Sequence, residues 1–153
     1  MELLTSQVAE IAVRYFNKQK ASDRPKVTTS SDAYHILFKK FNPDILHYQE
    51  EFLAMYLNRA NHVLGIYRVG LGGNSSVTAD PKIIVAVALK VAASGIIISH
   101  SHPSGSLSPS QHDKDVTHKI LHGAKFLDLK LLDHLIVSPQ SGEYYSFADE
   151  GII

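Results

Sequence analysis

The sequence contains no cysteine and no surplus of either charge. Without thiols the chain cannot form a disulfide, and it cannot hold zinc through thiolate ligands. A zinc deaminase of the His/Cys/Cys type is excluded for the same reason. The 15 basic and 15 acidic residues cancel, so the broad basic face that nucleic-acid binding normally needs is not expected. A small local patch is compatible with this composition, and nucleic acid stays an alternative partner that the charge does not favour.

Long apolar runs are also lacking, and no stretch reaches the length needed to cross a membrane. The first residues, with Glu2 early and no apolar core behind it, do not resemble a signal peptide. We therefore expect a cytoplasmic protein with no membrane partner. The length of 153 residues suits one domain with a substantial core. Composition does not indicate whether the chain forms homo-oligomers.

Short apolar runs alternate with helical patterns through the middle of the chain. Apolar residues on both sides of the run 52–57 indicate a strand that is covered on both faces. The alternation predicts an α/β fold, in which a mixed central β-sheet is flanked by helices on both faces. Strands are expected at 50–57, 63–69, 95–99, 129–137 and 143–147, and helices from Ser30 or Ser31, at 82–93 (buried, because it is nearly all apolar) and from Pro109 to about His122, with Gly123 as the stop.

The first 27 residues are expected to form a separate N-terminal segment that packs on the main domain, residues 28–153. Residues 8–16 are apolar enough for a strand or a short helix, and periodicity does not distinguish the two. Residues 18–26 are polar and basic, which is typical of a solvated linker. The Gly-rich residues 70–76 predict a flexible loop near the functional site.

Nine histidines without a cysteine mean that a metal site would be built from imidazole and carboxylate. His100 and His102 follow a buried strand and are two residues apart, so on extended backbone both rings point to one side. Asp113, at the start of the next helix, is the best candidate for a third ligand. Two histidines and one carboxylate would leave a fourth zinc position open for water, the catalytic arrangement. One zinc ion is predicted.

The helix that carries Asp113 has a recognisable start. Ser108 is the expected N-cap, Pro109 the first helical residue, and Gln111 the partner that completes a capping box. Ser110 and Asp113 are three residues apart and therefore share a face of the helix. The carboxylate would also lie near the positive end of the helix dipole.

The pattern His-x-His, seven residues beginning with proline, then Ser-x-x-Asp resembles the signature of the JAMM (MPN) metalloproteases. The residues that match this signature without an insertion are His100, His102, Ser110 and Asp113. The longer run 102–113 is similar to the RadC branch, a bacterial group historically named for DNA repair, in which Asn usually stands where this chain has Ser101. The resemblance spans roughly Thr28 to the C-terminus. It implies the JAMM/MPN fold, whose sheet is related in layout to that of the cytidine deaminases.

The resemblance implies a zinc-dependent metallohydrolase that cleaves a peptide or isopeptide amide bond with a water activated by the metal. The implied substrate is a protein or peptide. A glutamate on an earlier strand takes the water's proton in this family, and the Glu-x-Phe motif of RadC relatives selects Glu50 over Glu51. Strand alternation places these two glutamates on opposite sides, so at most one can serve. Ser110 would donate to the developing oxyanion; an ordinary helix-start serine that bonds its own backbone is the alternative.

Two other functions remain as hypotheses: a DNA-associated repair or recombination factor, as the RadC name suggests, and a non-catalytic MPN scaffold. His118 and His122, four residues apart on one helix, are a weaker metal-binding pair. His112 is expected beside the site without ligating. Asp133-His134, within an apolar strand, is predicted to be a structural pair; support of a metal-binding histidine from behind is the alternative.

Overall fold

The computed structural model describes residues 8–73 and 77–153, and its centre is one mixed five-stranded sheet with the strand order β2-β1-β3-β4-β5. β1 pairs antiparallel with β2 and β3, β3 pairs parallel with β4, and β5 closes the sheet antiparallel to β4. The elements in chain order are the 3-10 turn η1 (Ala21–Asp23), α2 (Ser30–Phe38), β1 (Glu51–Leu57), β2 (Val63–Leu71), α3 (Pro81–Lys90), β3 (Gly95–Ser101), α4 (Gln111–Lys125), β4 (Lys130–Val137) and β5 (Tyr144–Ser146).

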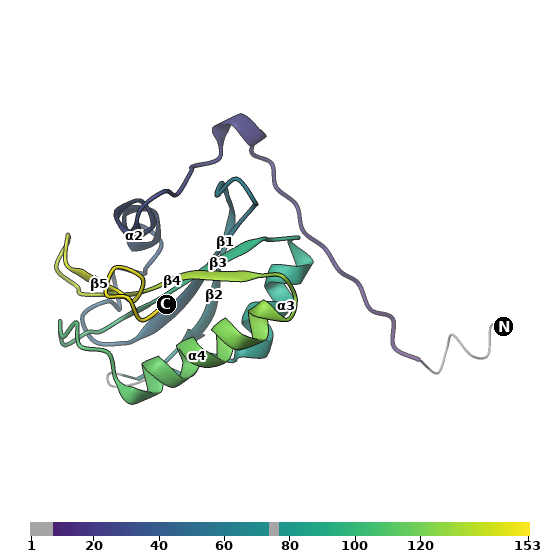
Figure 1. Cartoon of the computed structure of the whole chain (residues 1–153). Helices are drawn as coiled ribbons and strands as arrows, with labels where there is room; N and C mark the ends of the chain where they lie inside the picture. Colours follow the sequence, from purple (N-terminus) through teal and green to yellow (C-terminus); the bar gives the residue numbers. More distant parts are fainter. Residues whose placement is uncertain (1–7, 74–76) are drawn as a thin grey trace.

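The sheet has helices on both faces, as the alternation of apolar runs predicted (Figure 1). All of β1 is buried, and its side chains alternate between two apolar clusters. Phe52, Ala54 and Tyr56 pack on the side of α3 and α4. Residues 53, 55 and 57 pack on the side of α2. The α/β fold class is therefore confirmed, and side chains of β1 are shared between two cores.

Helix starts differ from the predictions by one or two residues. Thr29, rather than Ser30 or Ser31, caps α2, because its hydroxyl accepts from the Asp32 N–H while the Asp32 carboxylate accepts from the Thr29 N–H. Gly123 was predicted to end α4, but the helix continues to Lys125 and packs Ala124 into the core. A glycine inside a helix lowers its propensity without breaking it, and burial of the following alanine outweighs that cost.

Helix α3 starts one residue before the predicted range 82–93, with the Asp80 side chain accepting from the Lys82 N–H and Pro81 at the first position. The prediction that the whole apolar helix is buried was wrong. Ile84 and Ala88 are buried, whereas the side chain of Leu89 is 53% exposed. Only one side of α3 rests on the sheet, so an apolar sequence does not lead to burial all round.

The N-terminal segment forms neither the strand nor the helix expected for residues 8–16. It runs as an extended arm away from the sheet, and Ile11 is 87% exposed (Figure 1). Near the C-terminal end of the arm, Tyr15 contacts the domain, where its Oη donates to the Leu64 carbonyl of β2 at 2.6 Å. Its apolar side chains have no packed face opposite them within the described residues, and a regular element needs such a face to be stable.

The predicted loop 70–76 starts later than expected. Gly70 and Leu71 belong to β2, and residues 74–76 lie outside the described residues. Next to them, the Gly72 N–H donates to the Glu50 carbonyl and the Glu50 N–H donates to the Gly73 carbonyl, both at 2.8 Å. These two bonds hold the backbone of Glu50 just before β1. In the described ranges, no helix has both the length and the apolar character to cross a bilayer.

Candidate metal centre

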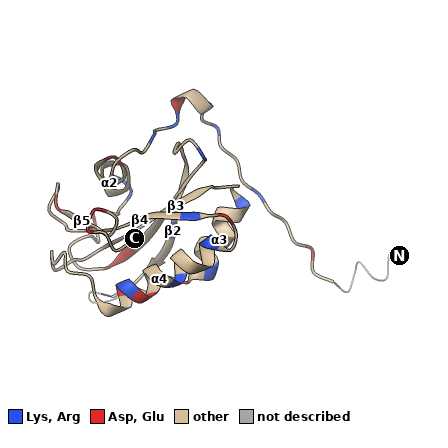
Figure 2. Ribbon diagram, in the orientation of Figure 1, with Lys and Arg blue, Asp and Glu red and all other residues tan. Residues whose placement is uncertain are grey.

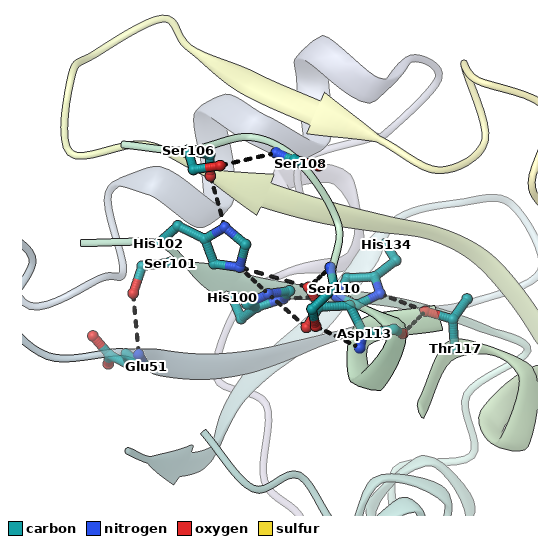
Figure 3. A network of polar contacts seen from close by, with 10 residues as sticks. All are labelled: Glu51, His100, Ser101, His102, Ser106, Ser108, Ser110, Asp113, Thr117 and His134. Atoms are coloured by element: carbon teal, nitrogen blue, oxygen red, sulfur yellow. Dashed lines mark hydrogen bonds and ion pairs between the residues drawn. The ribbon is translucent and has the colours of Figure 1, made fainter. Parts of the chain in front are cut away.

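The end of β3 and the first turn of α4 bring His100, His102 and Asp113 together (Figure 3). The Nε2 atoms of the two histidines are 2.9 Å apart. The carboxylate faces both rings, with Oδ1 3.2 Å from His100 Nε2 and Oδ2 3.6 Å from His102 Nε2. Within the described part of the chain, this is the one group of three such side chains close enough to share an ion.

Strand β3 fixes the position of His100. Its ring lies on the α4 face of the sheet, opposite Phe52 of β1, and stacks on the Phe52 ring with centroids 5.7 Å apart. His102 lies one step beyond the strand, where its N–H donates to the Val137 carbonyl at 2.9 Å and prolongs the pairing with β4. Extended backbone from residue 100 to 102 is what turns both rings to the same side.

The start of α4 fixes Asp113. Ser110 is the N-cap: its hydroxyl accepts from the Asp113 N–H at 3.0 Å, and Asp113 Oδ2 accepts from the Ser110 N–H at 2.8 Å. The prediction of a box formed by Ser108 and Gln111 was therefore wrong, because the sequence offers two overlapping boxes. The box that forms, between Ser110 and Asp113, also turns Asp113 Oδ1 toward His100. This contact joins two separate elements, so it cannot be read from the sequence around the helix start.

These donors suit a divalent cation. His102 Nδ1 lies 2.6 Å from the Ser106 carbonyl, which only accepts, so the ring hydrogen of a neutral His102 is on Nδ1. The lone pair of His102 Nε2 then faces His100 and the carboxylate. A positive charge shared among them would stabilise this convergence, and two nitrogens with one oxygen are a typical donor set for zinc. The residues present thus fit the metal that the motif implies.

The electrostatics of the group agree with this fit. Burial disfavours the charged form of Asp113, but the bonds that His100 and His102 donate when their rings are protonated outweigh it and hold the pKa of the carboxyl well below its usual range. Burial also lowers the pKa of His102, yet its bonds with Asp113 and the Ser106 carbonyl leave that pKa raised overall. Asp113 is therefore a carboxylate at neutral pH, as a metal ligand must be.

Glu50 and Glu51 lie on opposite sides of the sheet. Glu50, 7% exposed, lines a pocket of about 510 Å³ together with His102, Ser110 and Asp113. Burial raises the pKa of the Glu50 carboxyl, and the neighbouring His100 partly offsets this rise. Glu51 is directed to the other face, where its carboxylate accepts from Arg68 Nε at 2.8 Å. The structure thus brings Glu50, and not Glu51, to the candidate metal centre.

Ser110 is exposed and lines the same pocket. Its oxygen accepts the capping bond, which leaves the hydroxyl hydrogen free to point at a bound molecule. His112 lines the pocket without joining the group of donors, as expected. His118 and His122 lie together on the outer face of α4 but do not form a three-ligand group with another described residue.

Two further residues lie behind the site. His134 is fully buried, and its Nε2 is 2.8 Å from His100 Nδ1. Its other ring nitrogen, Nδ1, is 2.7 Å from the hydroxyl of Thr117. The Asp133 carboxylate accepts from the Ser146 hydroxyl at 2.6 Å and from the His134 N–H at 2.7 Å, the structural role that was predicted, whereas the ring of His134 lies behind His100, as in the alternative. Thr117 was missed; the signal was its position four residues after Asp113, on the same face of α4.

An α/β domain with a His/His/Asp group between the end of β3 and the first turn of α4 has the arrangement of a JAB (MPN) type domain with a candidate metal site. The chain matches the family model of the RadC-like JAB domain over residues 27–152 and belongs to that family, which confirms the resemblance seen in the sequence. It is 38% identical over 144 residues to a UPF0758 protein of Flavobacterium johnsoniae, covering 92% of this chain and 61% of the relative.

It is also 33% identical over 151 residues to a UPF0758 protein of Aquifex aeolicus, covering 99% of this chain and 62% of the relative. The chain thus spans about three fifths of the length of these two curated relatives. The JAB family includes metalloproteases. The names of the two relatives state no activity.

Proposed function

We propose that the chain is a zinc-dependent hydrolase that cleaves an amide bond in a peptide or an isopeptide linkage. The observation that carries this proposal is the convergence of three metal donors, two of which line a pocket together with a buried carboxylate that is not a ligand. His100, His102 and Asp113 would hold one ion. Glu50 lines the same pocket, at a position suited to proton transfer.

The bound ion would polarise the substrate carbonyl and lower the pKa of a water molecule. Glu50 would take the proton from the attacking water and pass it to the leaving amine. The raised pKa of its carboxyl brings its basicity closer to neutral pH, which favours both transfers. The Ser110 hydroxyl hydrogen, which the cap does not use, would stabilise negative charge on the carbonyl oxygen.

Metal content tests the first half of the proposal. Protein purified without chelator should contain one zinc per chain by elemental analysis, and Asp113→Ala should lose it while the fold, followed by circular dichroism, remains. Asp115→Ala is the matched control, since Asp115 lies on the same helix and its carboxylate accepts only from Gln111 there. Zinc that remains bound in Asp113→Ala would contradict the proposed ligand set.

Hydrolysis tests the second half. The zinc-loaded protein should cleave members of a panel of quenched peptides and isopeptide-linked conjugates. The metal-free protein should not, and added zinc should restore cleavage. Equal rates with and without zinc would contradict the proposal.

A role on nucleic acid has less support. Figure 2 shows Lys and Arg on the arm, on β4 and on helices α3 and α4, interspersed with Asp and Glu rather than gathered on one element. With equal numbers of acidic and basic residues, duplex or branched DNA should bind weakly and only at low salt. Tight binding with a steep salt dependence would favour the DNA-associated function instead.

A further inference from the structure

Two of the three candidate ligands are joined behind the site by side chains that do not ligate. We propose that His134 and Thr117 form a hydrogen-bond relay from His100 to Asp113, and that this relay keeps the Nε2 lone pair of His100 free for a cation. The relay has three links: His100 Nδ1 to His134 Nε2 at 2.8 Å, His134 Nδ1 to Thr117 Oγ1 at 2.7 Å, and Thr117 Oγ1 to the main-chain carbonyl oxygen of Asp113 at 2.6 Å (Figure 3).

The direction of the relay follows from its last link. A carbonyl oxygen only accepts, so the single hydroxyl hydrogen of Thr117 is donated to Asp113. Toward His134 the hydroxyl must then accept, which places the hydrogen of the His134 ring on Nδ1. His134 Nε2 is left as an acceptor, and His100 Nδ1 donates to it. A neutral His100 that carries its hydrogen on Nδ1 has a bare Nε2, the atom that faces His102 and Asp113.

Burial and stacking leave the His134 ring little freedom to choose another arrangement. His134 and Thr117 are both fully buried, and the ring of His134 stacks on Phe147 with centroids 4.5 Å apart. The register of β3 and β4 pairs His134 with Ile98, two residues before His100, so both rings lie on the α4 face of the sheet.

His134 acts on the ion through His100 and is therefore a positioning residue. Its Nε2 is directed at His100 Nδ1, on the far side of the His100 ring from the proposed ion, and it is not part of the three-ligand group. His102 receives the equivalent support from the Ser106 carbonyl. Each metal-binding ring thus has a partner that places its hydrogen on Nδ1, which is how metal-binding histidines are commonly oriented.

The relay rests on the proposed metal centre but not on hydrolysis, and its first test needs no metal. Nitrogen-15 NMR of the imidazole rings in the metal-free protein, at mildly alkaline pH, reports which ring nitrogen carries the hydrogen. We expect Nδ1–H with a bare Nε2 for both His134 and His100. A hydrogen on Nε2 of His134 would overturn the relay whether or not the protein binds zinc.

The second test measures zinc affinity by competition with a chromophoric chelator. Thr117→Val removes the hydroxyl and should weaken zinc binding by about 10- to 100-fold, the usual cost of losing a partner of a metal ligand. Thr117→Ser keeps the hydroxyl and should restore most of the affinity. Ser99→Ala is the matched control, because it removes a buried hydroxyl next to His100 that has no partner among the described residues.

The outcomes separate the relay from the proposed function. If Thr117→Val left both the zinc affinity and the His100 tautomer unchanged, the relay would be overturned while the metal centre stood. If the wild-type protein bound no zinc, the proposed function would fail, and the ring tautomers would still decide whether the relay exists. If Thr117→Val failed to fold, the tautomers of the wild-type protein and the affinity of Thr117→Ser would decide it.

Discussion

Glu50 and Glu51 are adjacent in the sequence and both buried, yet they lie on opposite faces of the sheet in contrasting surroundings. The Glu51 carboxylate accepts from Arg68 Nε at 2.8 Å and from the Asn42 N–H at 2.9 Å. The Glu50 side chain has no hydrogen bond or ion pair to any residue in the ranges 8–73 and 77–153, and it lines the pocket. A buried carboxylate with partners stabilises a fold; one without partners costs stability and is available for chemistry.

The two faces also each have a helix that begins with a capping box. On α2, Asp32 caps the helix with Oδ2 and remains partly exposed. On α4, Asp113 caps with Oδ2 and directs Oδ1 to His100. The same local motif is structural in one helix and can serve both purposes in the other, and the difference lies entirely in what the rest of the fold places opposite.

The largest effect should separate the two glutamates. Glu50→Gln should reduce the hydrolysis rate by about 10²- to 10⁴-fold, the usual contribution of a general base. Zinc content should stay at the wild-type level, because Glu50 is not in the ligand group. Glu51→Gln, compared per folded molecule in the same assay, should remain close to wild type. Full activity of Glu50→Gln would remove this residue from the mechanism.

The two caps should differ next. Thr29→Ala and Ser110→Ala should each lower the free energy of unfolding by about 1 kcal/mol, measured by urea titration, because each loses an N-cap bond. Only Ser110→Ala should also lower the hydrolysis rate, by about 10²- to 10³-fold, as for the loss of one oxyanion donor. Ser110→Thr keeps a hydroxyl and should retain more activity. Equal activity of the two alanine variants would leave Ser110 a structural cap.

Stability should reverse the ranking of the glutamates. Glu51→Gln should lower the free energy of unfolding by about 1–3 kcal/mol, because it weakens the bonds of a buried carboxylate. The loss is limited by Arg68, whose side chain is half exposed and can turn to solvent. Glu50→Gln should be neutral or slightly stabilising in the same denaturation series, since it removes a buried charge that has no hydrogen-bond partner among the described residues. A clear destabilisation by Glu50→Gln would show that the Glu50 carboxylate, like that of Glu51, stabilises the fold.

The smallest effect concerns protonation. In the metal-free protein, carbon-13 NMR of the Glu50 carboxyl should give a pKa above the ordinary value for glutamate, because burial disfavours the charged form. Zinc binding should lower this pKa, since a nearby cation favours the carboxylate. A base works above its own pKa, so the pH range in which Glu50 can accept a proton should extend to lower pH in the zinc-loaded protein than in the metal-free protein. A Glu50 pKa that zinc leaves unchanged would place the ion elsewhere; Glu50→Gln provides the assignment control.

Local rules explain which parts of the site could be predicted from the sequence. His100 and His102 needed only the alternation of an extended strand, and Asp113 only its position near a helix start. The exact cap could not be chosen, because the boxes starting at Ser108 and Ser110 both satisfy the local rule and the contact with His100 decides between them. The roles of long-range partners such as Thr117 were beyond local rules.

Long-range register explains most of the remaining errors. His134 faces the site because β4 pairs in parallel with β3, and that pairing shifts register between Ile96 and Ile97. A shift of one residue in a strand reverses which face each side chain occupies, so the sequence alone could not assign His134 to either face. The extended arm at residues 8–16 and the exposed side of α3 differ from prediction for a related reason. The apolar pattern of a segment does not show whether another part of the chain packs against it.

The reciprocal cap between Ser110 and Asp113 has a consequence for how the protein would acquire its ion. Both bonds of the cap join groups of Ser110 and Asp113 themselves, so the first turn of α4 does not need an ion to form. A newly made molecule would therefore present a finished receptor, in contrast to small zinc modules that collapse only around their ion. Cellular metal supply, rather than completion of folding, would then determine what fraction of the molecules is competent.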